Sequence, residues 1–176
     1  MIPIILAIVT AFLPLQDTPE KLHPWSGHSW NYRNADGKLT KISVSRSWTW
    51  VRFRGKDVRV HPASWMGREA YLLEKPGETW ILGEGVVGKN GEKGNVLRYS
   101  FRWKGEEKWS FTRVSGCIAW KVACAREGVA TVAGIRSTRF RIGKERWVIS
   151  RENGIFEISR RDGTWKLAAR GKHLDR

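Results

Sequence analysis

The carboxylates and histidines of this 176-residue chain are the first side chains to test for chemistry, because most hydrolytic and metal sites are built from them. Eight of the 17 acidic residues stand at expected turns: Asp36, Asp57, Glu78, Glu106, Glu107, Glu145, Glu152 and Asp162. A glycosidase needs two carboxylates across one cleft, and Glu157 has no second acid near it in the expected strand pattern. The four histidines show no better ligand spacing than His23-x4-His28. We therefore expect no catalytic residue, no metal site and no cofactor.

Two further motifs that carry chemistry are also weak. Residues 83–95 hold five glycines but lack the Gly-Lys-Ser/Thr ending of a phosphate-binding loop. In one straight strand, Cys117 and Cys124 would lie roughly 23 Å apart, whereas a disulfide needs Cα atoms within roughly 7 Å. Export would favour a bridge, so a disulfide and two packed thiols both remain open.

Basic side chains outnumber acidic ones, with 32 Lys and Arg against 17 Asp and Glu. Alternation along the predicted strands turns one group of them outward on a shared face: Arg98, Arg102, Lys104 and Lys108. Like charges paired across strands destabilise a sheet, so this patch predicts an anionic partner such as a lipid headgroup or an acidic envelope polymer. The alternative is a charged exterior that only keeps the protein soluble. Nucleic acid is not expected, because no recognition module is visible.

The chain contains eleven tryptophans, and aromatic residues dominate one face of several predicted strands. Seven of them are candidates to line a cavity for an apolar ligand: Tyr99, Phe101, Trp103, Trp109, Phe111, Trp147 and Trp165. Apolar pockets often lie in barrel mouths, but the same residues equally suit a filled core. Trp48 and Trp50, beside Arg52, form a further candidate platform for carbohydrate or a lipid surface.

These side chains are positioned by strands, because apolar and polar residues alternate with period two along most of the chain. Residues 95–115 are the clearest case. Their pattern predicts a hairpin with Trp103 opposite Trp109 and Phe101 opposite Phe111, around a loop at 105–107.

Other turn signals predict further opposed pairs. They are Trp30–Val44 across a bulged Asp36-Gly37 turn, Phe53–Val58 across Gly55-Lys56, Leu73–Trp80 across Pro76-Gly77, Ile149–Ile158 across Asn153-Gly154, and Ile158–Leu167 across Asp162-Gly163. The whole pattern predicts an all-β fold of about 11–14 strands, an antiparallel meander that closes into an up-and-down or half-open barrel.

The N-terminal residues 1–19 differ from the rest, because residues 2–15 are apolar and uncharged. As a helix this run would rise roughly 21 Å, short of the ~30 Å of a bilayer core. It predicts a signal peptide, with a short hydrophobic anchor as the alternative. Residues 20–176 are expected to form one all-β domain. A repeated glycine–tryptophan plan suggests two related halves, 27–83 and 95–170, joined by the glycine-rich loop.

Several short motifs resemble those of a known group. They are Gly27/Trp30/Tyr32, Gly105/Trp109/Phe111, Ala133-Gly134 with Phe140, and then Trp147, Gly154 and Trp165. In these the chain is similar to exported bacterial β-proteins of the DUF3108 type. The resemblance implies export and a β-rich, half-barrel fold, and it implies no activity.

The sequence thus predicts an exported, non-catalytic all-β protein of the bacterial cell envelope, periplasmic or extracellular, that binds an apolar or anionic amphiphile. One alternative is a structural or interaction module with a solid core and no small-molecule ligand. A weaker one is a glycan-binding or glycan-active protein.

Overall fold

The computed structural model describes residues 23–87 and 93–172, which form an antiparallel all-β fold. The leader expected at 1–19 lies outside these residues. Thirteen strands follow one another: β1 (His28–Arg33), β2 (Leu39–Val44), β3 (Thr49–Phe53), β4 (Lys56–Trp65), β5 (Arg68–Lys75), β6 (Glu78–Val87), β7 (Lys93–Arg102), β8 (Lys108–Ser115), β9 (Ile118–Val132), β10 (Ile135–Ile142), β11 (Glu145–Ser150), β12 (Gly154–Arg160) and β13 (Gly163–Lys172). Among the described residues there is no helix long and apolar enough to cross a membrane.

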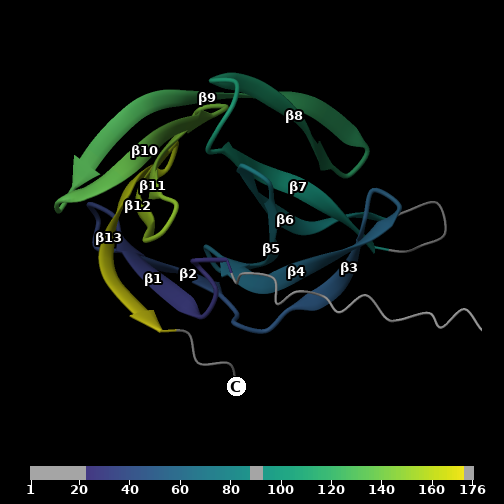
Figure 1. Cartoon of the computed structure of the whole chain (residues 1–176), viewed down its shortest axis with the longest axis horizontal. Coiled ribbons are helices and arrows are strands. Elements are labelled where there is room, and N and C mark those ends of the chain that lie inside the picture. Colours follow the sequence, from purple (N-terminus) through teal and green to yellow (C-terminus); the bar gives the residue numbers. More distant parts are fainter. Residues whose placement is uncertain (1–22, 88–92, 173–176) are drawn as a thin grey trace, which may run out of the picture.

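The strands form one sheet that curls into a nearly closed barrel, which confirms the predicted fold class (Figure 1). Neighbours run in the order β7-β6-β5-β4-β2-β1-β13-β12-β11-β10-β9-β8. The first and last strands pair with each other, since His28 lies opposite Lys172 and Trp30 opposite Arg170. The two ends of the described chain therefore meet in the middle of the sheet, and its free edges are β7 and β8.

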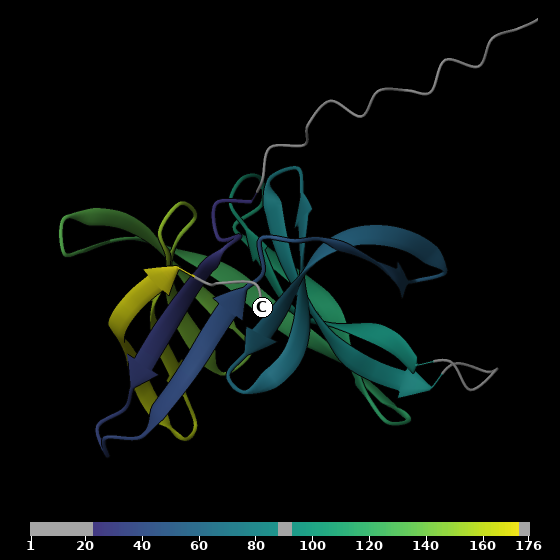
Figure 2. The same ribbon diagram turned by 90° about the horizontal axis from the view of Figure 1, so that it is seen from below.

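The β3–β4 hairpin departs from a simple meander. β2 pairs with the last part of β4, where Val44 lies opposite Ala63, while β3 pairs with the first part, where Val51 lies opposite Val58. The hairpin therefore reaches out from the ring as an arm (Figure 2). Phe53 at its tip packs on Trp80 of β6, with ring centroids 5.9 Å apart.

The predicted hairpin at 95–115 is wrong. β7 pairs with β6 and β8 pairs with β9, so β7 and β8 flank an unsealed seam and form no ladder with each other. Trp103 and Trp109 do not oppose one another as cross-strand neighbours. Each instead contacts Phe140 of β10, at 5.2 and 6.2 Å between ring centroids. Polar and apolar residues do alternate along both strands, but β7 belongs to the ladder with β6 and β8 to the ladder with β9.

The turn predictions in the N-terminal half had mixed outcomes. Across Pro76-Gly77, Leu73 lies opposite Trp80 as predicted. The predicted pair Trp30–Val44 is wrong, because Trp30 lies opposite Ile42 and the loop is longer than a bulged two-residue turn. The pair Phe53–Val58 is also wrong. Arg54 and Gly55 both have positive φ and form the turn, so Phe53 lies opposite Lys56.

The two C-terminal turns are also displaced from their predicted registers. Ile149 lies opposite Ile155 rather than Ile158, and Ile158 lies opposite Trp165 rather than Leu167. In both hairpins the glycine begins the second strand, so the turn lies one residue earlier than predicted. At Ile158 the register moves by two residues, which leaves the side chain on its predicted face. At Ile149 it moves by three residues, because a bulge lies between Val148 and Ile149.

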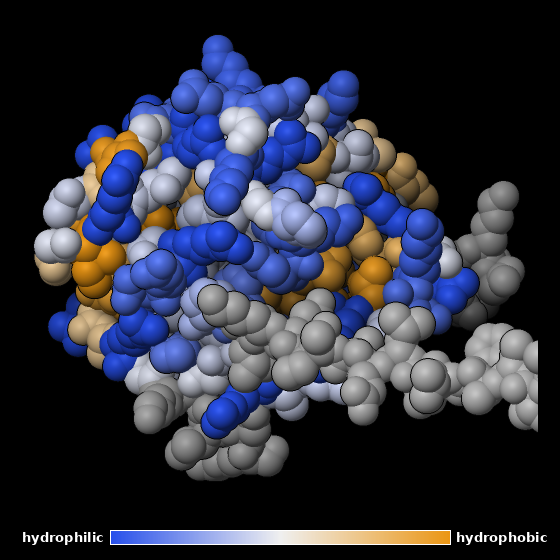
Figure 3. All heavy atoms as spheres, in the orientation of Figure 1, coloured by the Kyte–Doolittle hydropathy of each residue, from blue (hydrophilic) through white to orange (hydrophobic). Residues whose placement is uncertain are grey.

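Aromatic side chains fill much of the barrel. The largest fully buried ones are Trp25, Trp30, Tyr32, Phe101, Phe140 and Trp147. Their contacts cross the ring, since Trp65 of β4 lies 5.8 Å from Trp147 of β11. Most of the visible exterior is hydrophilic, with a hydrophobic area at the left of Figure 3. Val129 of β9 is one of the exposed large hydrophobic residues.

Candidate functional site

The seam between β7 and β8 opens at one end into a cavity of about 720 Å³, which we call the seam cavity. Its walls come from both free edges and from the β8–β9 turn. Its lining includes Val96, Arg98, Arg113, Val114, Cys117 and Trp120. Small-molecule sites commonly occupy roughly 300–1,000 Å³, so the cavity is large enough for a ligand.

Arg98 reaches this cavity because of a local irregularity in β7. Ile81 lies opposite Tyr99 and Leu82 opposite Leu97, so Arg98 is the extra residue of a bulge. Its side chain crosses Gly83, where a Cβ would stand only 1.7 Å from the Arg98 Nε. Its Nη2 then donates to the carbonyl oxygen of Glu84 at 3.1 Å. The bulge and the glycine together direct this guanidinium into the cavity.

Arg113 reaches the same place from the other side of the seam. Its Nη2 donates to the carbonyl oxygen of Arg98, which ties β8 to β7 without a ladder. Its guanidinium lies 5.1 Å from the ring centroid of Tyr99 and 5.7 Å from that of Phe111. Aromatic faces attract cations, so these two rings hold Arg113 in position.

The two arginines bring positive charge into the seam, where Glu84 is the one carboxylate among the described lining residues. The Nε atoms of both are buried and have no hydrogen-bond partner. Among the described residues, neither arginine belongs to any ion pair with a carboxylate. Burial, followed by the charges of Arg68 and Arg113, lowers the pKa of Arg98. An unpaired buried donor costs free energy, so an anion at this site would recover part of that cost.

The remaining walls of the seam cavity are largely apolar. Val96 is buried, Val114 is half-buried, and the Trp120 side chain is 41% exposed. Ile118, next to the opening on β9, is 69% exposed. Large exposed apolar side chains grouped beside a cavity are a mark of ligand or surface contact. The site thus offers two cations at its inner end and hydrocarbon contacts towards solvent.

The predicted basic patch is only partly brought together. Arg98 turns into the seam rather than outward, so that part of the prediction is wrong. Arg102 forms ion pairs with Glu78 at 3.3 Å and with Glu106 at 3.2 Å. Lys104 and Lys108 are exposed in and after the loop between β7 and β8.

The predicted aromatic set is mostly buried and packed together. Tyr99 lies 5.0 Å from Trp147, and Phe101 lies 5.7 Å from it, between ring centroids. Trp103 and Trp109 pack on Phe140, as described above. Two further members are buried as well: Phe111 and Trp165. Only Tyr99 and Phe111 touch the seam cavity's arginines, as the rings that support Arg113.

Several residues of the seam cavity were not found from the sequence. Gly83, Val114 and Trp120 carried no functional signal, because their role depends on which strands face each other across the seam. Arg113 is separated from Phe111 by one residue, and the basic patch predicted from the sequence did not include it. The signal available was the pair of arginines at 98 and 113, which stand at similar distances along the chain from the loop that joins β7 to β8.

Both cysteines are free thiols. Cys117 is exposed in the β8–β9 turn and lines the seam cavity. Cys124 is buried, and burial raises the pKa of its thiol to about 12. Within residues 23–87 and 93–172, no group of three or more His, Cys, Asp or Glu side chains is placed to hold a metal ion.

Comparison of the chain with protein-family models, with curated proteins and with solved structures finds no match.

Proposed function

We propose that this protein is a non-catalytic binding protein that holds an anionic amphiphile in the seam cavity. The anionic group lies between Arg98 and Arg113, and the hydrocarbon portion runs along Val96, Val114 and Trp120. The observation that carries the proposal is the pair of buried guanidinium Nε atoms without hydrogen-bond partners. The large cavity and its apolar outer wall support it.

The cellular setting is part of the same proposal. We place the protein outside the cytoplasm, in the bacterial cell envelope. Support comes from the apolar run at residues 2–15 and from the resemblance to exported β-proteins of the DUF3108 type. Lipids and other amphiphiles with anionic headgroups are abundant partners for a basic protein in that setting.

The test uses three probes. Dodecanoate has both a carboxylate and a long alkyl tail, dodecanol has the tail without the charge, and acetate has the charge without the tail. Isothermal titration calorimetry on delipidated protein should show binding of dodecanoate and much weaker binding of the other two. Arg98→Gln and Arg113→Gln should each weaken dodecanoate binding by about ten- to hundredfold, because charge-assisted hydrogen bonds contribute about 1.5–3 kcal/mol. Arg139→Gln, at an exposed arginine of β10, is the matched control and should bind normally.

Two results would contradict this function. The first is binding of dodecanol as tight as that of dodecanoate, which would show that the arginines do not contribute to affinity. The second is wild-type affinity for dodecanoate in both arginine variants, with unchanged melting temperatures. Native mass spectrometry of protein purified without detergent adds a direct readout, since a co-purifying anionic lipid should be present.

The second candidate is a structural or interaction module without a ligand. It is favoured by the dense aromatic interior, in which Trp30, Phe101 and Trp147 are fully buried. It expects no bound lipid and no heat of binding with any of the three probes.

A further inference from the structure

The turn between β8 and β9 is exposed although most of its residues are apolar. We call residues 114–120 the hairpin tip; they read Val-Ser-Gly-Cys-Ile-Ala-Trp and include no charged residue. Val114 is half-buried and the other six are exposed, with 69% exposure for Ile118 and 41% for Trp120. Large apolar side chains that are exposed together mark a contact surface.

The hairpin tip forms one rim of the seam cavity. Val114, Cys117 and Trp120 line that cavity, whereas Ile118 lies outside its lining. In Figure 1 the β8–β9 turn lies at the right of the ring and the β9–β10 turn at the left, so the two ends of β9 are on opposite sides of the molecule. A partner on the hairpin tip would therefore meet the mouth of the seam cavity and not the far end of β9.

The charged residues nearest to the hairpin tip along the chain are basic. Arg113 precedes it and Lys121 follows it, and residues 108–126 include four basic residues and no acidic one. Arg113 turns into the seam, while Lys121 is exposed. The carboxylate of Glu84 lines the cavity from β6, across the seam. With a formal net charge of +15, the protein as a whole is also attracted to anionic surfaces.

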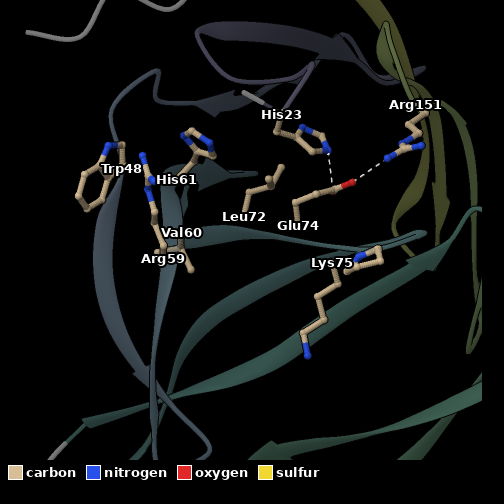
Figure 4. Close-up of a pocket in the computed structure, with 10 residues that line it drawn as sticks. His23, Trp48, Arg59, Val60, His61, Leu72, Glu74, Lys75 and Arg151 are labelled. Carbon is tan, nitrogen blue, oxygen red and sulfur yellow. Dashed lines mark hydrogen bonds and ion pairs between the residues drawn. The ribbon is translucent and has the colours of Figure 1, made fainter. Parts of the chain in front are cut away.

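The exposed tryptophans of the β3–β4 arm have different surroundings. Trp48 lines a smaller cavity of about 300 Å³, and the guanidinium of Arg59 lies 3.9 Å from the centroid of its ring (Figure 4). Trp50 is followed on β3 by Arg52, which forms an ion pair with Asp57 at 3.1 Å. Charged groups are costly to bring into a bilayer. The uncharged hairpin tip is therefore better suited to enter a lipid surface than the arm is.

We infer that the hairpin tip docks on the surface of an anionic lipid bilayer. Ile118 and Trp120 enter the boundary between headgroups and acyl chains, a region in which tryptophan is enriched in membrane proteins. Lys121 stays among the anionic headgroups, which attract it. Docking in this way brings the mouth of the seam cavity against the lipid, so an amphiphile can pass between bilayer and cavity. That passage rests on the function proposed above, whereas docking itself needs no occupant in the cavity.

The experiment compares vesicles of phosphatidylcholine alone with vesicles of equal parts phosphatidylcholine and phosphatidylglycerol. The full chain should sediment with the anionic vesicles and much less with the neutral ones. Ile118→Asp should weaken binding to the anionic vesicles by about tenfold or more, because it removes an inserted aliphatic side chain and adds a charge in its place.

Val129→Asp is the matched control. Val129 is 51% exposed on the same strand and lies opposite Thr138, near the β9–β10 turn. The substitution changes the net charge by the same amount as Ile118→Asp does. It should alter vesicle binding by less than about twofold, because salt screens a charge that lies far from the contact.

The outcomes separate docking from the seam cavity. Absence of binding to anionic vesicles overturns the inference, as does equal binding to neutral ones. Equal losses in Ile118→Asp and Val129→Asp would mean that net charge, not the hairpin tip, sets the affinity. Self-association that Ile118→Asp abolishes, without vesicle binding, would assign the tip to a second copy of this chain.

Dodecanoate binding distinguishes the two proposals. Ile118→Asp should bind dodecanoate like the wild type, so docking can fail while the function proposed for the seam cavity stands. Vesicle binding that depends on Ile118, in a protein that does not bind dodecanoate, is the reverse case: docking stands and the proposed function fails.

Discussion

The indole ring of Trp30 occupies the space in which a side chain on residue 154 would stand. A Cβ at Gly154 would lie 2.4 Å from the ring. The Trp30 Nε1 also donates to the carbonyl oxygen of Asn153 at 3.0 Å, and the hydroxyl of Tyr32 donates to that of Ile155 at 3.0 Å. β1 is thereby fastened to the start of β12, past the intervening strand β13.

Gly154→Ala should destabilise the protein by about 2–4 kcal/mol. Gly154 has a φ of 93°, which is strained for any other residue, and the added methyl group also overpacks the Trp30 site. Urea denaturation measures the change. Gly163→Ala is the control, because Gly163 has a φ of 118° but nothing within 4 Å of its Cβ position. It should cost about 1–2 kcal/mol, and equal costs for the two variants would show that Trp30 does not matter.

Buried tyrosines should make the protein lose stability at high pH. Burial raises the pKa of Tyr32 well above its ordinary value, and burial, aided by the charge of Glu145, raises the pKa of Tyr99 to about 12. The unfolded chain releases these protons near pH 10 while the folded protein keeps them. The contribution of these tyrosines to the free energy of unfolding is therefore fully present below pH 10 and decreases as the pH rises towards 12.

Tyr99→Phe is the variant that tests this pH dependence. It removes one titrating hydroxyl and keeps the ring that supports Arg113. Between pH 9 and 11.5, the loss of unfolding free energy should be smaller than in the wild type, by on the order of 1–2 kcal/mol. Denaturant titrations at each pH supply the comparison. An unchanged loss would mean that Tyr99 ionises as readily in the folded protein as in the unfolded chain.

Glu74 should contribute stability that disappears in acid. Burial raises the pKa of Glu74, but hydrogen bonds and charge from His23, with hydrogen bonds from Thr79 and Arg151, outweigh it and leave the pKa below its ordinary value. This contribution is present above pH 4.5 and is lost as the pH falls through the folded pKa. Glu74→Gln should therefore flatten the decline of melting temperature between about pH 6 and pH 3.

A neighbouring acid provides the control for that measurement. Glu152 is exposed in the turn next to Arg151. Glu152→Gln should keep the wild-type dependence of melting temperature on pH. If Glu74→Gln keeps it too, the His23–Glu74–Arg151 contacts contribute nothing to acid stability.

The seam should be the first part of the barrel to open. β7 and β8 share no ladder, and side chains bridge them: Trp109 Nε1 donates to the Ser100 Oγ at 3.0 Å, and Arg113 donates to the Arg98 carbonyl. Unpaired strand edges exchange their amide hydrogens readily. Hydrogen exchange should be faster in β8 than in β1 and β13. Arg113→Gln should speed exchange in β8 and leave β1 unchanged; protection of β8 equal to that of β1 would contradict the open seam.

The predictable part of this fold is the face on which each side chain lies. Ile149 and Ile158 are both fully buried on the predicted inner face, although they are not direct neighbours. A two-residue slip preserves period-two alternation, so the pattern alone does not distinguish the registers. Turn chemistry decides between them. It predicted the register at Pro76-Gly77 and failed at Asp36-Gly37, at Gly55-Lys56 and at the two hairpins in which glycine begins the second strand.

The seam site could not be predicted for a related reason. Leu97 and Tyr99 alternate like residues on one face, but the bulge at Arg98 places them on opposite sides of β7. Nothing local in the sequence marks that bulge. His23, His61 and Arg151 line a second cavity, beside the β3–β4 hairpin, although they are far apart in the chain. The spacing of the histidines in the sequence did not indicate that they lie close together.

Cys117 gives the seam cavity a built-in attachment point for a reporter group. It is the exposed member of the two cysteines, while Cys124 is buried with its pKa raised to about 12. A maleimide dye or a nitroxide should therefore modify the wild-type chain at one position, on the rim where an alkyl tail would leave the protein. Quenching of the dye, or the mobility of the nitroxide in its electron paramagnetic resonance spectrum, can follow occupancy without any engineered mutation.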